Sequence, residues 1–172
     1  MSVQPSLVQA MIQRELGAVR RTVAAYPDDL SVWSERPGLP NSGGTLVLHI
    51  AGNLQHYLGT LLGRSGYRRD REAEFSRRGV PRSALLAEID AAQAAVDLGF
   101  RQLTAEAFLQ PFPELIGGRR FITGDYLVHL ASHLAYHLGQ LDYHRRAVTG
   151  DQRSIGALAP GELPEWGPGS TD

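Results

Sequence analysis

The positions of the prolines constrain the fold of this chain more than any other feature. Proline is excluded from helix interiors because it lacks a backbone N–H and clashes with the preceding turn. Each long segment between prolines is therefore a candidate helix. The ten prolines divide the 172-residue chain into such segments and stand at residues 5, 27, 37, 40, 81, 111, 113, 160, 164 and 168.

Four of these segments carry apolar side chains three or four residues apart, as in the run Val8, Ile12, Leu16. That spacing is typical of amphipathic helices, and the chain shows no strong alternating pattern of a β-strand. Four long helices in one chain of this length predict an all-α four-helix bundle. The predicted helices cover residues 6–26, 45–62, 82–106 and 123–148.

Residues near the helix ends support these boundaries. Pro81 stands at or near the first position of the third helix, Thr123 is a candidate N-cap of the fourth, and Gly150 is placed to end it. We expect residues 1–149 to form one bundle domain. Residues 150–172 are rich in Gly and Pro without periodicity, which predicts a loose C-terminal tail.

The composition excludes several classes of site and partner. Without cysteine the chain cannot form a disulfide, a thiolate metal site, an iron–sulfur cluster or a catalytic thiol, so His and carboxylates must hold any metal. A formal charge of −1 gives no overall field for a nucleic acid or a membrane, and we expect neither as a partner. The N-terminus lacks the pattern of a secretory signal, and polar residues interrupt the uncharged stretch 37–63, so we expect a cytoplasmic protein.

All six histidines fall on the second and fourth predicted helices, in which residues 45–62 and 126–141 contain no Asp, Glu or Arg. We expect these two helices to be the more buried pair. Buried imidazoles need hydrogen-bond or metal partners. The histidines are His49 and His56 on the second helix, and His129, His133, His137 and His144 on the fourth.

The spacing of the histidines allows a metal site. His129, His133 and His137 follow one another at i, i+4 and i+8, so they share one helix face. An i, i+4 pair is a natural helical chelate for a borderline metal ion. His49 and His56 lie about 10 Å apart along their helix, so at most one of them joins that pair. The alternative is a seam of histidines hydrogen-bonded to backbone carbonyls, amides or water, in a plain helical dimer.

Several familiar catalytic motifs are missing. The segment 133–137, HLAYH, lacks the glutamate of a zincin's HExxH motif, and no Glu-x-x-His pair of a ferritin-like di-iron bundle occurs. The chain also lacks a phosphate-binding glycine loop and a GxSxG nucleophile elbow. The arginine-rich stretch 64–78 is either a solvated connector or a rim that receives an anionic substrate or thiol cofactor.

Three segments resemble the DinB/YfiT-like superfamily of metal-binding proteins. They are HIAGNLQHYLGTLLG at 49–63, YRRDREAEF at 67–75 and SHLAYHLGQLDYHRR at 132–146. The resemblance implies a four-helix bundle, often dimeric, with a divalent metal bound by one histidine of the second helix and an HxxxH pair of the last. Carried over by position, these ligands are His49, His133 and His137.

The resemblance also assigns weaker roles. It makes His129 a residue that lines the pocket, and His56 and His144 structural or peripheral. Independently of the resemblance, Asn53, Tyr136 and Gln140 are candidates for orienting ligands, a cofactor or a substrate, and the alternative for Tyr136 is a position on the bundle surface.

Characterised members of the superfamily are mainly thiol-dependent enzymes, which implies a function here. We expect a metal-dependent transferase that joins a low-molecular-weight thiol, such as bacillithiol or mycothiol, to a small electrophile. Zinc is the expected metal, with nickel, iron and manganese as alternatives, because imidazole affinity alone does not select among them. A non-catalytic metal-binding stress-response bundle and a metal-dependent hydrolase are the alternative functions.

The second helix is apolar around much of its circumference. Together with the resemblance, this feature predicts a homodimer.

Overall fold

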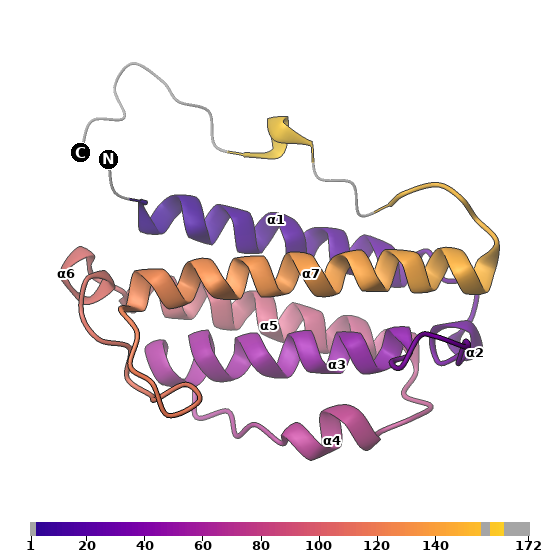
Figure 1. The fold of residues 1–172 in the computed structure, drawn as a ribbon, viewed down its shortest axis with the longest axis horizontal. Helices are drawn as coiled ribbons and strands as arrows, with labels where there is room; N and C mark the ends of the chain where they lie inside the picture. The colour runs from indigo at the N-terminus through magenta and orange to yellow at the C-terminus, as the bar shows by residue number, and fades with distance from the viewer. Residues whose placement is uncertain (1–2, 156–158, 164–172) are drawn as a thin grey trace.

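The computed structural model describes residues 3–155 and 159–163. Its long helices run side by side as a bundle, in which α1 and α3 each pack against both α5 and α7 (Figure 1). Within the described residues the chain forms isolated β-bridges but no strand. The helices are α1 (Pro5–Ala24), α2 (Asp29–Val32), α3 (Gly43–Leu54), the π-helix η1 (Gln55–Leu62), α4 (Arg71–Ser76), α5 (Arg82–Gln102), α6 (Ala105–Phe108), α7 (Thr123–Thr149) and the 3₁₀-helix η2 (Pro160–Glu162).

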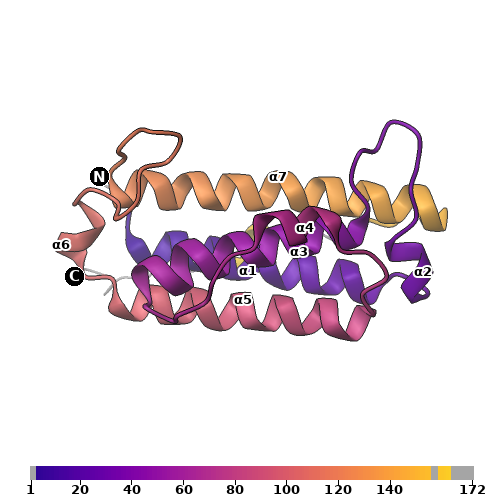
Figure 2. The ribbon, with the colours of Figure 1, turned by 90° about the horizontal axis from the view of Figure 1, so that it is seen from below.

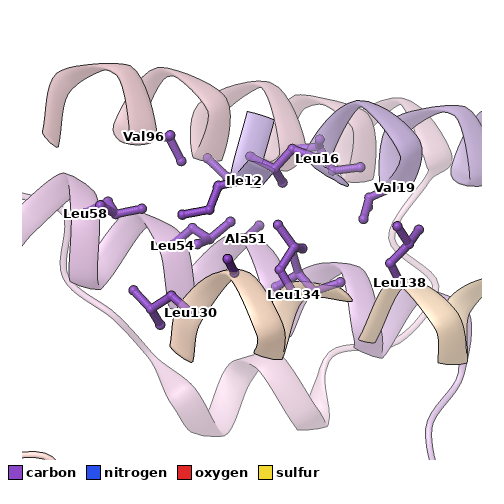
Figure 3. Packing of buried hydrophobic residues seen from close by; sticks show 14 of the residues in the cluster. Ile12, Leu16, Val19, Ala51, Leu54, Leu58, Val96, Leu130, Leu134 and Leu138 are labelled. Carbon is purple, nitrogen blue, oxygen red and sulfur yellow. The ribbon is translucent and has the colours of Figure 1, made fainter. Parts of the chain in front are cut away.

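One hydrophobic core lies between the four long helices, as the bundle prediction requires. The apolar stripe predicted for the first helix is buried along α1. Figure 3 shows side chains of α1 meeting those of α3, α5 and α7 in this core. Burial of these side chains removes apolar surface from water and is the main stabilising contribution. The labelled side chains are Ile12, Leu16, Val19, Ala51, Leu54, Leu58, Val96, Leu130, Leu134 and Leu138.

The first part of the second predicted helix, α3, is buried on every side, and the chain itself covers it, whereas only three of the eight residues of η1 are buried. All residues of α3 are buried. The bundle covers its inner side, and α4, within the arginine-rich stretch, lies against its outer side (Figures 1 and 2). The apolar circumference of this helix therefore does not require a second chain.

The expectation that the second and fourth helices are the more buried pair agrees with the structure, because α3 is wholly buried and 12 of the 27 residues of α7 are buried, against 8 of 20 in α1 and 7 of 21 in α5. The outer face of α7 is open to solvent, with Tyr136 and Tyr143 65% and 68% exposed. No helix among the described residues is long and apolar enough to cross a lipid bilayer.

Two predicted helix ends need correction. The third helix ends at Gln102 rather than at residue 106, because Leu103 is extended and the Thr104 hydroxyl caps the separate short helix α6. The N-cap of α7 is Ile122 rather than Thr123. The Thr123 hydroxyl is not available as a cap because it donates to the backbone carbonyl of Gln110 at 2.9 Å. By contrast, Gly150 ends α7 in the left-handed conformation, as predicted.

The second predicted helix changes from α to π geometry after Leu54. At its end the Gly63 N–H donates to the carbonyl of Leu58, five residues back, at 2.8 Å. This π-helix packs closely on α5, where a Cβ at Gly99 would lie 2.6 Å from the Leu58 carbonyl oxygen. Glycine at this position therefore allows the two backbones to approach.

The first residues after α7 pack against it. Arg145 is fully buried and forms ion pairs with Asp142 at 3.3 Å and Asp151 at 3.1 Å. The backbone N–H of Ile155 donates to Asp142 at 3.4 Å. Much of the predicted loose tail, residues 156–158 and 164–172, lies outside the described residues.

Candidate metal centre

Three histidines from two helices meet between α3 and α7. His49 belongs to α3, and His133 and His137 come from successive turns of α7. Their candidate ligand atoms all lie within 4.8 Å of one another. The Nε2 atoms of His133 and His137 are 3.0 Å apart, and the ring centroid of His49 lies 4.9 Å from that of His137. The structure thus groups one histidine of the second predicted helix with an i, i+4 pair of the fourth.

This spacing fits a small divalent cation. Nitrogen ligands about 2.0–2.1 Å from a tetrahedral zinc ion lie roughly 3.4 Å from one another. Among the described residues, the group contains three candidate ligands and no fourth. Three protein ligands with one free position are typical of catalytic rather than structural zinc sites. The three histidines could therefore hold a divalent metal ion.

A buried carboxylate on α4 orients His49. Glu74 Oε2 accepts a hydrogen bond from His49 Nδ1 at 3.0 Å, so the lone pair of Nε2 is free for a metal ion. Arg69 holds Glu74 in turn, because its Nε and Nη2 atoms donate to the two carboxylate oxygens at 2.6 and 2.9 Å. Burial alone would raise the pKa of Glu74, but the hydrogen bonds from His49 and Arg69 hold it below its usual value. Glu74 is therefore a charged acceptor at neutral pH.

Gly52 makes room for this carboxylate. It lies on α3 three residues after His49, and a Cβ there would come within 2.8 Å of Glu74 Cδ and closer still to Oε1. Any side chain at this position would therefore push the carboxylate away from His49. Glycine in a helix interior is unfavourable by about 1 kcal/mol relative to alanine, so the close approach gives a physical reason for it.

Gln140 orients His137 in the same way. Gln140 Oε1 accepts a hydrogen bond from His137 Nδ1 at 2.7 Å, which leaves His137 Nε2 without a proton. Two of the three histidines therefore expose a lone pair on Nε2 and have Nδ1 held by an oxygen acceptor. This tautomer is the one that allows a histidine to bind a metal ion through Nε2.

Burial favours the neutral form of His133 and His137 by lowering their pKa values. It is the largest cause that lowers the pKa of His133 to about 4, and repulsion from protonated His137 and His49 adds to it. Burial also lowers the pKa of His137, although the hydrogen bond with Gln140 partly opposes it. A neutral imidazole is the form that binds metal ions, so protons compete weakly with a metal at His133 near neutral pH.

The metal-free protein should lose stability in acid through His133. The unfolded chain takes up this proton near pH 6.5, whereas the folded chain takes it up near pH 4. Protonation therefore favours the unfolded state as the pH falls from 6.5 to 4, and the stabilisation present above that window is lost. In the presence of a chelator, we expect the urea midpoint of His133→Asn to fall less steeply between pH 7 and 4.5 than that of the wild type. Equal slopes for the variant and the wild type would contradict the prediction.

The remaining candidates of the site lie around the three histidines. Asn53 follows His49 by one helical turn, is buried, and has no side-chain hydrogen bond within the described part of the chain. His129 is exposed, and its ring centroid lies 6.0 Å from that of His133. Tyr136 is mostly exposed, with its ring centroid 5.3 Å from that of His137.

The other two histidines have partners away from the three-histidine group. His56 pairs with Glu114 at 3.3 Å. His144 is buried; its Nε2 donates to the Ser34 carbonyl at 2.8 Å, and its Nδ1 accepts from the Tyr26 hydroxyl at 2.7 Å. Both arrangements are structural contacts between a long helix and a connecting segment.

Reasoning from the sequence missed Glu74 and Arg69. The sequence predicts a connector or a rim for the stretch 64–78, whereas Glu74 turns inward to His49 and Arg69 holds Glu74 there. The signal that could have pointed to them is Gly52, because a glycine inside a buried helix indicates close approach of another segment.

Comparison with known proteins agrees with this architecture. A family model described as the DinB superfamily matches residues 11–141, which include α3, α4, α5 and the three histidines. No curated protein matches the chain. The match covers most of the chain and confirms the resemblance found in its motifs, so this protein belongs to the DinB superfamily.

Proposed function

We propose that this protein is a zinc-dependent enzyme that transfers a low-molecular-weight thiol to a small electrophile. The observation that carries the proposal is the group of three histidines, two of them with Nδ1 held by Glu74 and Gln140. His49, His133 and His137 would hold the ion. A bound zinc ion would supply a Lewis acid that lowers the pKa of a thiol or water at its free position.

The residues around the three histidines prepare the site for this chemistry. Glu74 and Arg69 hold the His49 ring, and Gln140 holds the His137 ring, so neither ring must reorient on binding. The Asn53 amide, one turn from His49, has no side-chain hydrogen bond to the residues that the structure describes, and we assign it to hydrogen bonding with the substrate or thiol.

An exposed cation beside the site supports an anionic thiol cofactor. The Arg71 guanidinium carbon lies 5.3 Å from the centroid of the Phe75 ring, and that ring lies 5.0 Å from the ring of His49. Bacillithiol and mycothiol are the low-molecular-weight thiols that we propose as cofactors, and Arg71 would pair with a carboxylate of bacillithiol, since mycothiol carries no carboxylate. The chain has no cysteine, so the sulfur must come from outside it.

The test begins with metal content and continues with turnover. Protein prepared without a histidine tag is stripped with chelator and reloaded separately with zinc, nickel, iron(II) or manganese. We expect one equivalent of zinc per chain, and thiol consumption with an electrophile panel that depends on the ion. Arg71→Gln should raise the KM for the thiol and leave zinc content unchanged, and Arg101→Gln on α5 is the matched control.

The outcomes separate the proposed enzyme from its alternatives. Stoichiometric zinc with a large rise in Tm but no thiol-dependent or hydrolytic turnover would indicate a non-catalytic metal-binding bundle. Turnover without a thiol would indicate a hydrolase. Substoichiometric metal that His133→Ala does not change would contradict the metal site itself.

A further inference from the structure

An apolar pocket lies beside the three histidines. It has a volume of about 460 Å³ and lies between residues 39–41, Leu46 at the start of α3, and Tyr136 and Tyr143 on α7. We call it the Tyr136–Tyr143 pocket. Its volume lies within the range of small-molecule sites, about 300–1,000 Å³. None of the three candidate metal ligands lines it.

Gln140 connects this pocket to the candidate metal centre. Its side chain lines the pocket, and its Oε1 atom also accepts the hydrogen bond from His137 Nδ1 at 2.7 Å. The Gln140 side chain therefore contacts both the pocket and the ring of His137. A small molecule with its reacting atom at the histidines could place a neighbouring group in the pocket.

The chemistry of the lining selects an uncharged group. None of the described residues that line the pocket is Asp, Glu, Lys or Arg. His144 reaches the pocket, but Tyr26 and Ser34 occupy both of its ring nitrogens, and burial lowers its pKa. A charged group placed there would lose hydration without an ionic partner among the described residues that line the pocket. Leucine, proline and tyrosine side chains offer apolar and aromatic surface instead.

We propose that the Tyr136–Tyr143 pocket binds a neutral apolar group, aryl or alkyl, of the electrophilic substrate. Gln140 stands between this group and the metal ligand His137. The assignment of the bound group to a substrate rests on the function proposed above. The binding of an apolar group to the pocket, by contrast, needs no metal ion. The class of substrate is therefore a small electrophile with an uncharged hydrophobic body rather than a polar metabolite.

Gly139 provides a way to fill the pocket without disturbing the fold. It lines the pocket on the exposed side of α7, and a Cβ at this position meets no atom within 4 Å. Gly139→Leu should therefore occupy the pocket, while Gly139→Ala leaves most of it free. Ala147→Leu, at another exposed position of α7, adds the same side chain outside the pocket.

The test measures two probes with the same ring and different charge. Binding of 2-naphthalenemethanol and of 2-naphthoate to the zinc-free full chain is followed by amide chemical shifts. We expect the alcohol to bind about fivefold or more tightly than the carboxylate and to shift Leu46, Gly139 and Tyr143. Gly139→Leu should weaken binding about tenfold, and Gly139→Ala and Ala147→Leu should leave it near the wild-type value.

Other results would overturn the proposal. They are equal binding of the two probes, shifts elsewhere in the chain, or wild-type binding by Gly139→Leu. Sedimentation at the same concentration provides one further test. A wild-type dimer that Gly139→Leu dissociates would show that a second copy of the chain fills the pocket, and this result would also overturn the proposal. Failure of the proposed function gives a different pattern, in which the alcohol binds as expected but the protein does not bind zinc or consume thiol.

Discussion

Replacing His133 with alanine should severely weaken zinc binding while the bundle still folds. The variant loses one of three candidate ligands, and we expect its zinc affinity to fall by more than about a hundredfold, beyond the usual effect of residues that only orient ligands. In the wild type, zinc at about 100 times Kd should add about 2.7 kcal/mol to stability and raise Tm by roughly 5–10 °C. That zinc-dependent rise should disappear in His133→Ala. Calorimetric titration and thermal melts with and without zinc measure both effects.

His129→Ala is the matched control for this prediction. It removes an imidazole one turn away on the same helix, from an exposed position. We expect it to keep zinc affinity within about threefold of the wild type, since it removes no candidate ligand. Equal losses in the two variants would show that the ion is not bound by the His49, His133 and His137 group.

The bundle itself could be predicted from the sequence because local patterns encode it. Proline positions and the apolar stripe of residues 6–26 correctly indicated long amphipathic helices, and their burial in α1 bears this out. Helix ends were less predictable, because tertiary contacts decide them. The Thr123 hydroxyl has the chemistry of an N-cap, yet it donates to the Gln110 carbonyl of the preceding connection instead.

The histidine group was only partly predictable. Spacing on one helix face indicated an i, i+4 pair, and the family motif selected His133 and His137 with His49. Helical spacing could not identify Glu74, because Glu72 and Asp70 lie in the same charged stretch and are equally good hydrogen-bond acceptors. The choice depends on how α4 lies against α3, which is a tertiary contact between segments about 25 residues apart.

Gly52→Ala should weaken zinc binding without a comparable effect on the fold. The new methyl group displaces the Glu74 carboxylate, whose flexible end can move at little steric cost, but the move breaks its hydrogen bond with His49. Residues that orient a metal ligand typically contribute about 10- to 100-fold in metal affinity, and we expect a loss in this range. Alanine favours the helix by up to about 1 kcal/mol, which offsets part of the lost interactions in the metal-free protein.

Gly139→Ala is the matched control, since it is the same substitution in a helix at a position where the methyl group meets no atom. It should stabilise the protein slightly and leave zinc affinity unchanged. The decisive measurement is a double-mutant cycle with Glu74→Ala. If Gly52 acts through Glu74, Gly52→Ala should change zinc affinity less than about twofold when Glu74 is already absent. Additive losses would contradict this coupling, and would mean that the carboxylate of α4 and the glycine of α3 affect the metal centre by separate routes.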